Sequence, residues 1–260
     1  FIYNKANANL TIDGLNNQIK DIFLKNEGVS NIKNANIQGE VINSKGTTNI
    51  NSGNYSNLIL NEAGTINIGN KSVGIYGVNY LDGVTSSLIL GYGNDKINIT
   101  NTGNIISTGT THGGYGIFAN DTAALGSTIT LGSSSNIDVS SGDAGIGIYA
   151  VNSTLNIDGN ITVGKDGVGI YASGSTGNIN GGTMSLNGDN AIGYYLTNFS
   201  NFTNTGGNIH VDGQNIILTI SDNNSSMNFT TPFTITATPS STYVAGSMTG
   251  GEFYNNTTAT

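Results

Sequence analysis

The chain has 260 residues with 38 Gly, no Cys and a formal net charge of −8, and every basic residue is Lys. Without Cys there is neither a disulfide nor a Cys-ligated metal. An acidic chain with no basic stripe is unsuited to nucleic acid or an anionic membrane surface, and no apolar run indicates a signal peptide or a membrane span. We therefore expect no nucleic-acid partner and no membrane insertion by this segment.

The N-terminal part, residues 1–55, shows the repeat pattern only loosely, and we expect less regular coils there. Its one stretch long enough for a helix is Leu15–Glu27. Gly and Asn flank this stretch, and both residue types favour turns and irregular strand over helix. The sequence therefore predicts strand here as well.

Residues 56–213 contain a short phrase that returns along the chain. It reads Gly-Ile-Tyr-Ala at Gly147–Ala150 and again at Gly169–Ala172. Variants occur at Gly74–Gly77, Gly116–Ala119 and Gly193–Leu196. A repeat of about 22 residues is typical of solenoid folds.

Each repeat holds three short alternating runs, such as Leu155–Ile157, Ile161–Val163 and Val168–Ala172, with Gly, Asn and Asp between them. Alternation of period two indicates strands, and Gly, Asn and Asp are the residues of tight turns. The sequence thus predicts an all-β fold. We expect a right-handed parallel β-helix with about 22 residues and three short strands per coil.

Strand alternation also predicts which side chains point inward in the last run of each coil. The columns expected in the core begin with Val73, Tyr115, Ile146, Val168 and Ile192 and continue two and four residues later. The interleaved aromatic column is expected to face outward and to form the binding surface: Tyr76, Phe118, Tyr149, Tyr171 and Tyr195. Two alternatives stay open, namely that loops cover this column or that the rings stack inside.

Residues 214–260 follow the repeat less well, and we expect irregular C-terminal coils cut from a longer chain. Pro232 and Pro239 bracket a short strand-like run, which predicts an irregular coil or the start of a side module because Pro is kept out of central ladders. Two insertions, Gly103–Gly114 and Asp121–Gly126, interrupt the repeat. Insertions in a solenoid map to loops on one face, often the binding face.

Coils rich in Asn and Gly, with Val-Gly-Ile-Tyr-Ala phrases such as Val168–Ala172, few charges and no Cys, resemble the secreted passengers of type V autotransporters. The chain is most similar to the very large autotransporter adhesins of fusobacteria, over roughly Ala35–Ile220. This resemblance implies a β-helix on the bacterial surface. It also implies a C-terminal β-barrel translocator that anchors the protein in the outer membrane and lies outside this segment.

Catalytic signals are weak, and we expect no enzyme, no cofactor and no metal. Autotransporter serine proteases carry Gly-Asp-Ser-Gly, whereas Gly142–Gly145 has Ala at the nucleophile position. His112 and His210 lie far apart in sequence, without a nearby carboxylate pair. A stripe of Asp143, Asp166 and Asp189 could bind Ca²⁺, but the glycine-rich calcium nonapeptide is absent.

The function expected from these features is that of an adhesin segment. Its partners would be a host cell-surface receptor or glycan, or the surface of another bacterium. The alternatives are a passive stalk that displays a binding tip elsewhere and, less favoured, a carbohydrate-active β-helix enzyme. An ice-binding Thr array is disfavoured because Thr128-Ile129-Thr130 has no match at Leu155 or Gly177.

Overall fold

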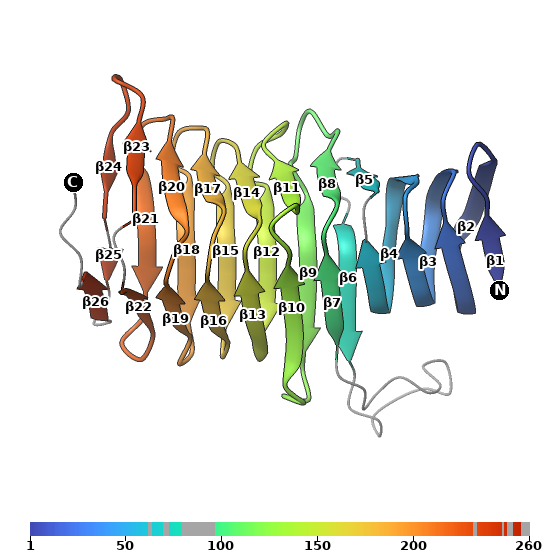
Figure 1. The fold of residues 1–260 in the computed structure, drawn as a ribbon, viewed down its shortest axis with the longest axis horizontal. Coiled ribbons are helices and arrows are strands. Elements are labelled where there is room, and N and C mark those ends of the chain that lie inside the picture. The colour runs from blue at the N-terminus through green and yellow to red at the C-terminus, as the bar shows by residue number, and fades with distance from the viewer. Residues whose placement is uncertain are drawn as a thin grey trace.

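The structure is a computed structural model that describes residues 1–61, 64–69, 73–79, 97–230, 233–245, 247–248 and 252–255. Every pairing between its strands is parallel, and each strand pairs with the equivalent strand of the next coil. The coils stack into a rod with β1 at one tip and β26 at the other (Figure 1). The predicted parallel β-helix is confirmed.

In the regular part, each coil contributes one strand to each of three walls. The first wall consists of β7 (Asn98–Asn101), β10 (Ser127–Leu131), β13 (Ser153–Ile157), β16 (Thr176–Ile179), β19 (Asn201–Asn204), β22 (Ser226–Phe229) and β26 (Glu252–Asn255). The second consists of β5 (Thr65–Ile68), β8 (Asn104–Ser107), β11 (Asn136–Val139), β14 (Asn160–Val163), β17 (Thr183–Leu186), β20 (Asn208–Val211) and β23 (Ile235–Ala237).

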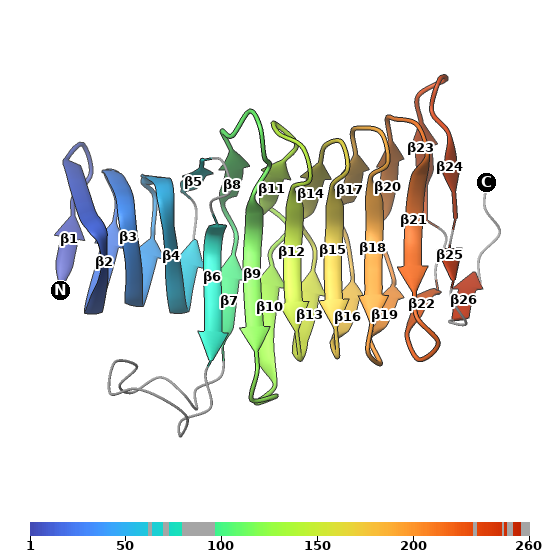
Figure 2. The ribbon, with the colours of Figure 1, turned by 180° about the vertical axis from the view of Figure 1, so that it is seen from behind.

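The strands form two sheets, and the first and second walls both belong to the larger one. The third wall is the smaller sheet and faces the viewer in Figure 2. It consists of β6 (Val73–Asn79), β9 (Tyr115–Asp121), β12 (Ile146–Val151), β15 (Val168–Ser173), β18 (Ile192–Thr197), β21 (Ile216–Ser221) and β24 (Tyr243–Val244), with β25 (Ser247–Met248) also paired to β21. β23 lies between the two prolines' positions and pairs with β20, so this run belongs to a coil. Pro232 itself lies outside the described residues.

The coils stack in register, so equivalent side chains lie directly above one another. Ile148 pairs with Ile170, and Tyr149 pairs with Tyr171. Inside the rod this produces columns of buried Ile, Leu, Val and Ala that form one continuous core. Since parallel strands are about 4.8 Å apart, each side chain packs directly on its counterpart in the next coil.

One predicted core column is wrong. Val73 is buried, but its counterparts lie half-buried on the outer face of the third wall: Tyr115, Ile146, Val168 and Ile192. The cause is the glycine that follows each of them. Gly147 and Ile148 are both buried, so strict alternation fails there, and the glycine pair is skipped in the register between β12 and β15.

Only glycine fits at this inward position. A Cβ added to Gly147 would lie 2.5 Å from Cγ2 of Ile161 and 2.6 Å from the carbonyl oxygen of Gly169. Both contacts are shorter than real Cβ atoms make. The glycine therefore lets the third wall pass close to the second wall, and it moves the preceding residue to the outside.

The N-terminal coils follow a different plan from the regular coils. The structure begins with β1 (Ile2–Asn4), followed by the long strands β2 (Asn9–Asn26), β3 (Val29–Asn43) and β4 (Thr47–Asn61). Val29 pairs with Thr47, so a coil here takes 18 residues rather than about 22. The predicted strand at Leu15–Glu27 is confirmed for its part within β2.

A ladder of buried asparagines closes the corner between the first and second walls in these coils. The Asn26 Nδ2 atom donates to Asn43 Oδ1 over 3.0 Å, and Asn43 Nδ2 donates to Asn61 Oδ1 over 2.9 Å. The ladder continues to Asn4 at one end and Asn101 at the other. Each amide uses one side to accept and the other to donate, so a polar column can stay buried without lost hydrogen bonds.

Replacing the inward glycine tests the close packing of the walls. Gly147→Ala is expected to lower the free energy of unfolding by about 1–3 kcal/mol because the new methyl group overpacks the core. Gly181→Ala is the matched control, since its added Cβ would meet nothing closer than 3.5 Å. Thermal and urea unfolding monitored by circular dichroism measure both. Equal stability of the two variants would contradict this account.

Breaking the asparagine ladder tests its contribution to stability. Asn43→Leu removes the donor to Asn61 Oδ1 and the acceptor for Thr48 Oγ1, and each buried polar group left unpaired costs about 1–3 kcal/mol. The control is Asn67→Leu, because Asn67 bonds Asn49 in a half-buried pair. We expect the denaturant midpoint to fall clearly only for Asn43→Leu. A similar small change in both would show that the ladder is dispensable.

Candidate binding surface on the third wall

The outer face of the third wall carries two adjacent apolar columns, here called the apolar face. All of these side chains are half-buried. The register of β9, β12, β15, β18 and β21 aligns them as Tyr115, Ile146, Val168, Ile192 and Ile217 in one column and Phe118, Tyr149, Tyr171, Tyr195 and Ile220 in the other. The two columns touch, because the Tyr115 ring meets the Phe118 ring edge-on at 5.4 Å.

The predicted aromatic column thus lies outside the core. The inverted alternative, with the rings stacked inside the rod, does not hold for Phe118, Tyr149, Tyr171 and Tyr195. The backbone of Tyr76 pairs with Phe118, but the side chain of Tyr76 lies outside the described part of the structure. Sequence alternation missed the neighbouring aliphatic column, and the repeated glycine was the signal that could have found it.

The rings stack on one another along the rod. Phe118 and Tyr149 are parallel within 3° at 4.6 Å between centroids, and Tyr149 and Tyr171 are parallel within 2° at 4.8 Å. Tyr171 and Tyr195 follow at 5.4 Å and 21°. The faces of the middle rings are therefore turned toward neighbouring rings. Ring edges and phenol hydroxyls remain for contact with a partner.

This geometry has chemical consequences. Burial by the neighbouring rings raises the pKa of the Tyr149 phenol, with smaller contributions from Tyr171 and Tyr115. The Tyr149 hydroxyl therefore stays protonated at neutral pH and can donate a hydrogen bond. A sugar ring that stacks on an aromatic face needs that face free, and the middle rings do not offer it. A flat apolar surface of a partner protein fits the ring edges and aliphatic side chains better.

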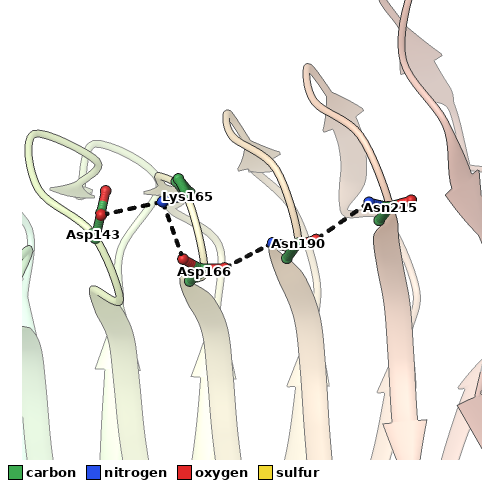
Figure 3. Close-up of polar contacts among 5 residues, drawn as sticks. All are labelled: Asp143, Lys165, Asp166, Asn190 and Asn215. Carbon is green, nitrogen blue, oxygen red and sulfur yellow. Dashed lines mark hydrogen bonds and ion pairs between the residues drawn. The ribbon is translucent and has the colours of Figure 1, made fainter.

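A polar ladder borders the apolar face where the chain enters the third wall (Figure 3). Lys165 Nζ lies 3.4 Å from Asp143 Oδ2 and 3.6 Å from Asp166 Oδ2. Asn190 Nδ2 then donates to Asp166 Oδ1 over 2.9 Å, and Asn215 continues the line. Asp166, Asn190 and Asn215 all have positive φ, a conformation that Asn and Asp tolerate better than other residues with side chains.

The same ladder bears on the proposed calcium stripe. Asp143 and Asp166 are bridged by the Lys165 ammonium, and the nearby carboxylates raise the pKa of this lysine. Asp189 takes a separate role, since its Oδ1 accepts the backbone amide of Gln214. The three carboxylates are thus engaged with a lysine or the backbone. In the described residues no group of His, Cys, Asp or Glu has the arrangement of a metal site.

The two histidines occupy separate places. The backbone of His112 bridges to Asp143 across the insertion loop. His210 lies on the second wall, where its Nδ1 atom is 2.8 Å from Thr236 Oγ1. The insertion at Asp121–Gly126 is anchored by the buried Asp121 carboxylate, which accepts the Ser127 hydroxyl over 2.7 Å.

A small cavity lies inside the described part of the rod. It has a volume of about 10 Å³ and lies beside Ile161, Met184 and the buried Tyr194. Such a volume holds about one water molecule.

Comparisons of this chain with protein-family models, with curated proteins and with solved structures give no match. Among the described residues there is also no helix long and apolar enough to cross a membrane. The function of the chain is therefore inferred from the side chains on the surface of the rod.

Tyr194 supplies a test of the interior next to the apolar face. Its burial raises the pKa of its phenol far above the ordinary value. A raised pKa in the folded state means that the stabilisation is present below the unfolded pKa, about 10, and is lost as the pH rises above it. Tyr194→Phe should therefore unfold at higher pH than the wild type in an alkaline titration followed by circular dichroism. Identical alkaline midpoints would contradict the burial of this phenol.

Proposed function

We propose that the chain is an extracellular adhesive segment of a bacterial surface protein, and that the apolar face binds the partner. The observation that carries this proposal is the apolar face itself, which runs across consecutive coils without an ionisable group other than its tyrosine phenols. The autotransporter resemblance supports a location on the cell surface. A chain without Cys also suits secretion in an extended state.

The rod provides its own comparison for this surface. On the first wall the outward positions of the same coils are Thr, Asn and Ser, for example Thr154 and Asn156 on β13. Polar outer columns are thus compatible with this fold. The fold does not require apolar residues on the third wall, and contiguous exposed apolar patches mark interaction sites.

The partner we propose is a protein on a host cell or on another bacterium. Ring edges, aliphatic side chains and phenol hydroxyls are the groups enriched in protein interfaces, and the polar ladder at Lys165 supplies a rim. A long rod repeats these groups in successive coils. A partner that spans several coils gains contacts without any deep pocket.

A passive stalk is the second candidate, and the ring stacking favours it. Each aromatic ring of the apolar face stacks on the next one along the rod, from Phe118 through Tyr149 and Tyr171 to Tyr195. Stacked aromatic pairs stabilise a fold by about 0.5–1.5 kcal/mol beyond the contribution of the area they bury. In this case the apolar face would serve only to stiffen the rod. The two functions differ in whether a partner is bound.

Substitutions on the apolar face distinguish them. Tyr171→Ala should weaken binding of the purified chain to host cells or bacteria at least tenfold, which corresponds to about 1.4 kcal/mol. Val168→Thr is the second variant, because it keeps a β-branched side chain and removes apolar surface without opening a hole in the stack. Thr162→Ala on the second wall of the same coil is the control. Binding is measured by flow cytometry and biolayer interferometry.

Circular dichroism verifies that each variant stays folded. Loss of binding in Tyr171→Ala and Val168→Thr, with Thr162→Ala unchanged, supports the adhesive function. Cell binding that is the same in all variants would place the contact elsewhere. An absence of binding by the folded wild type would leave the stalk as the function.

A further inference from the structure

The first wall carries a second continuous surface, here called the neutral strip. Its outward positions are hydroxyl and amide side chains on β7, β10, β13, β16, β19 and β22. One column begins Asn98, Thr128, Thr154, Thr176, and the register extends it through Asn201 to Ser226. The second outward column, which starts at Thr100, also contains only Thr and Asn.

We propose that the neutral strip binds an uncharged, hydroxyl-rich polymer, namely a neutral glycan lying along the rod. The strip offers both donors and acceptors at every rung, and rungs repeat about every 4.8 Å. Thr176 and Asn178 in the middle of the strip are exposed. Hydroxyl and amide side chains can both donate to and accept from sugar hydroxyls.

Charge excludes the anionic candidates. The chain carries a net charge of −8, and the strip contains no Lys that could attract phosphate, sulfate or sialic acid. A negatively charged ligand would be repelled by the field of the protein, whereas a neutral one would not. The strip itself has no carboxylate either, so it does not favour a basic partner.

The composition excludes a protein partner and an ice-like surface. A protein interface has an apolar core, which the neutral strip lacks and the apolar face provides. The register aligns Thr128 with Thr154 and Thr176, and these three residues form a column of threonines that the sequence analysis did not recognise. Its neighbour column, however, has Asn156 and Asn178 opposite Thr130, and the array is therefore not a uniform Thr surface.

Side chains of the strip bond one another along the rod. Thr128 Oγ1 donates to Asn98 Oδ1 over 2.8 Å, and Ser226 Oγ donates to Asn201 Oδ1 over 2.8 Å. Asn201 Nδ2 also donates to the carbonyl oxygen of Phe199 over 3.3 Å. An amide nitrogen carries two hydrogens, so Asn201 has a second N–H that can donate to a ligand. Single hydrogen bonds to sugar are weak in water. A polymer that meets successive rungs at once gains affinity by multivalency.

The test uses an array of neutral oligosaccharides of glucose, galactose, mannose and their N-acetyl derivatives, with matched sialylated and sulfated forms. The variant T154E/T176E places carboxylates in the middle of the neutral strip. The control T162E/S185E places the same charges on the second wall of the same two coils, at positions that also pair with each other. Both pairs lie outside the core and place two like charges on neighbouring strands, so the cost to stability is matched, and circular dichroism verifies that both variants fold.

We expect the wild type to bind neutral glycans with less than a twofold change between low and high salt. T154E/T176E should bind at least tenfold more weakly and T162E/S185E within twofold of the wild type. Tyr171→Ala should retain glycan binding, which separates this proposal from the adhesive role of the apolar face. The proposal is overturned if the wild type binds no neutral glycan, if both Glu pairs weaken binding equally, or if only Tyr171→Ala abolishes it.

Discussion

The structure depends on one constraint, the in-register stacking of parallel strands about 4.8 Å apart. Each residue must tolerate its own counterpart directly above and below. Ile, Leu and Ala satisfy this inside the rod, Asn satisfies it at a buried corner through amide ladders, and aromatic rings satisfy it outside by stacking. Charges satisfy it poorly, which agrees with a chain in which only 9% of residues are charged.

This constraint also shapes the outer surface of the rod. On the first and third walls, an outward position repeats with its chemistry in the next coil, so these two walls display stripes rather than isolated residues. The third wall displays ring edges and aliphatic side chains, and the first wall displays hydroxyls and amides. A rod of this kind can offer different chemistry to different partners on separate walls.

The fold could be predicted from the sequence because the recurring Gly-Ile-Tyr-Ala phrase reports the coil directly. The aromatic column was also placed correctly for Phe118, Tyr149, Tyr171 and Tyr195, since strand alternation holds after the phrase's isoleucine. It fails before that isoleucine, because Gly147 and Ile148 both face inward where the walls come close. A pattern of period two cannot show such a break, and the apolar face was therefore predicted one column too narrow.

Other features depend on distances that a linear pattern does not contain. The asparagine ladder joins residues such as Asn61 and Asn101, which lie 40 positions apart, and their pairing follows only from the register of β4 with β7. The shorter N-terminal coils likewise became evident from Val29 opposite Thr47. In both cases the sequence shows which residue type stands at each position, but it does not show which residue of the next coil that position pairs with.

The central claim is that a partner docks on the apolar face of the third wall. Site-specific photo-crosslinking measures this most directly, with a photoreactive amino acid placed at Ile146 or Ile192 and, for comparison, at Asn160 or Asn208 on the second wall. Incubation with host cells or bacteria and irradiation should give a discrete crosslinked protein only from the third-wall positions. Crosslinks from the second wall alone, or none from the third wall while the chain still binds cells, would contradict the account.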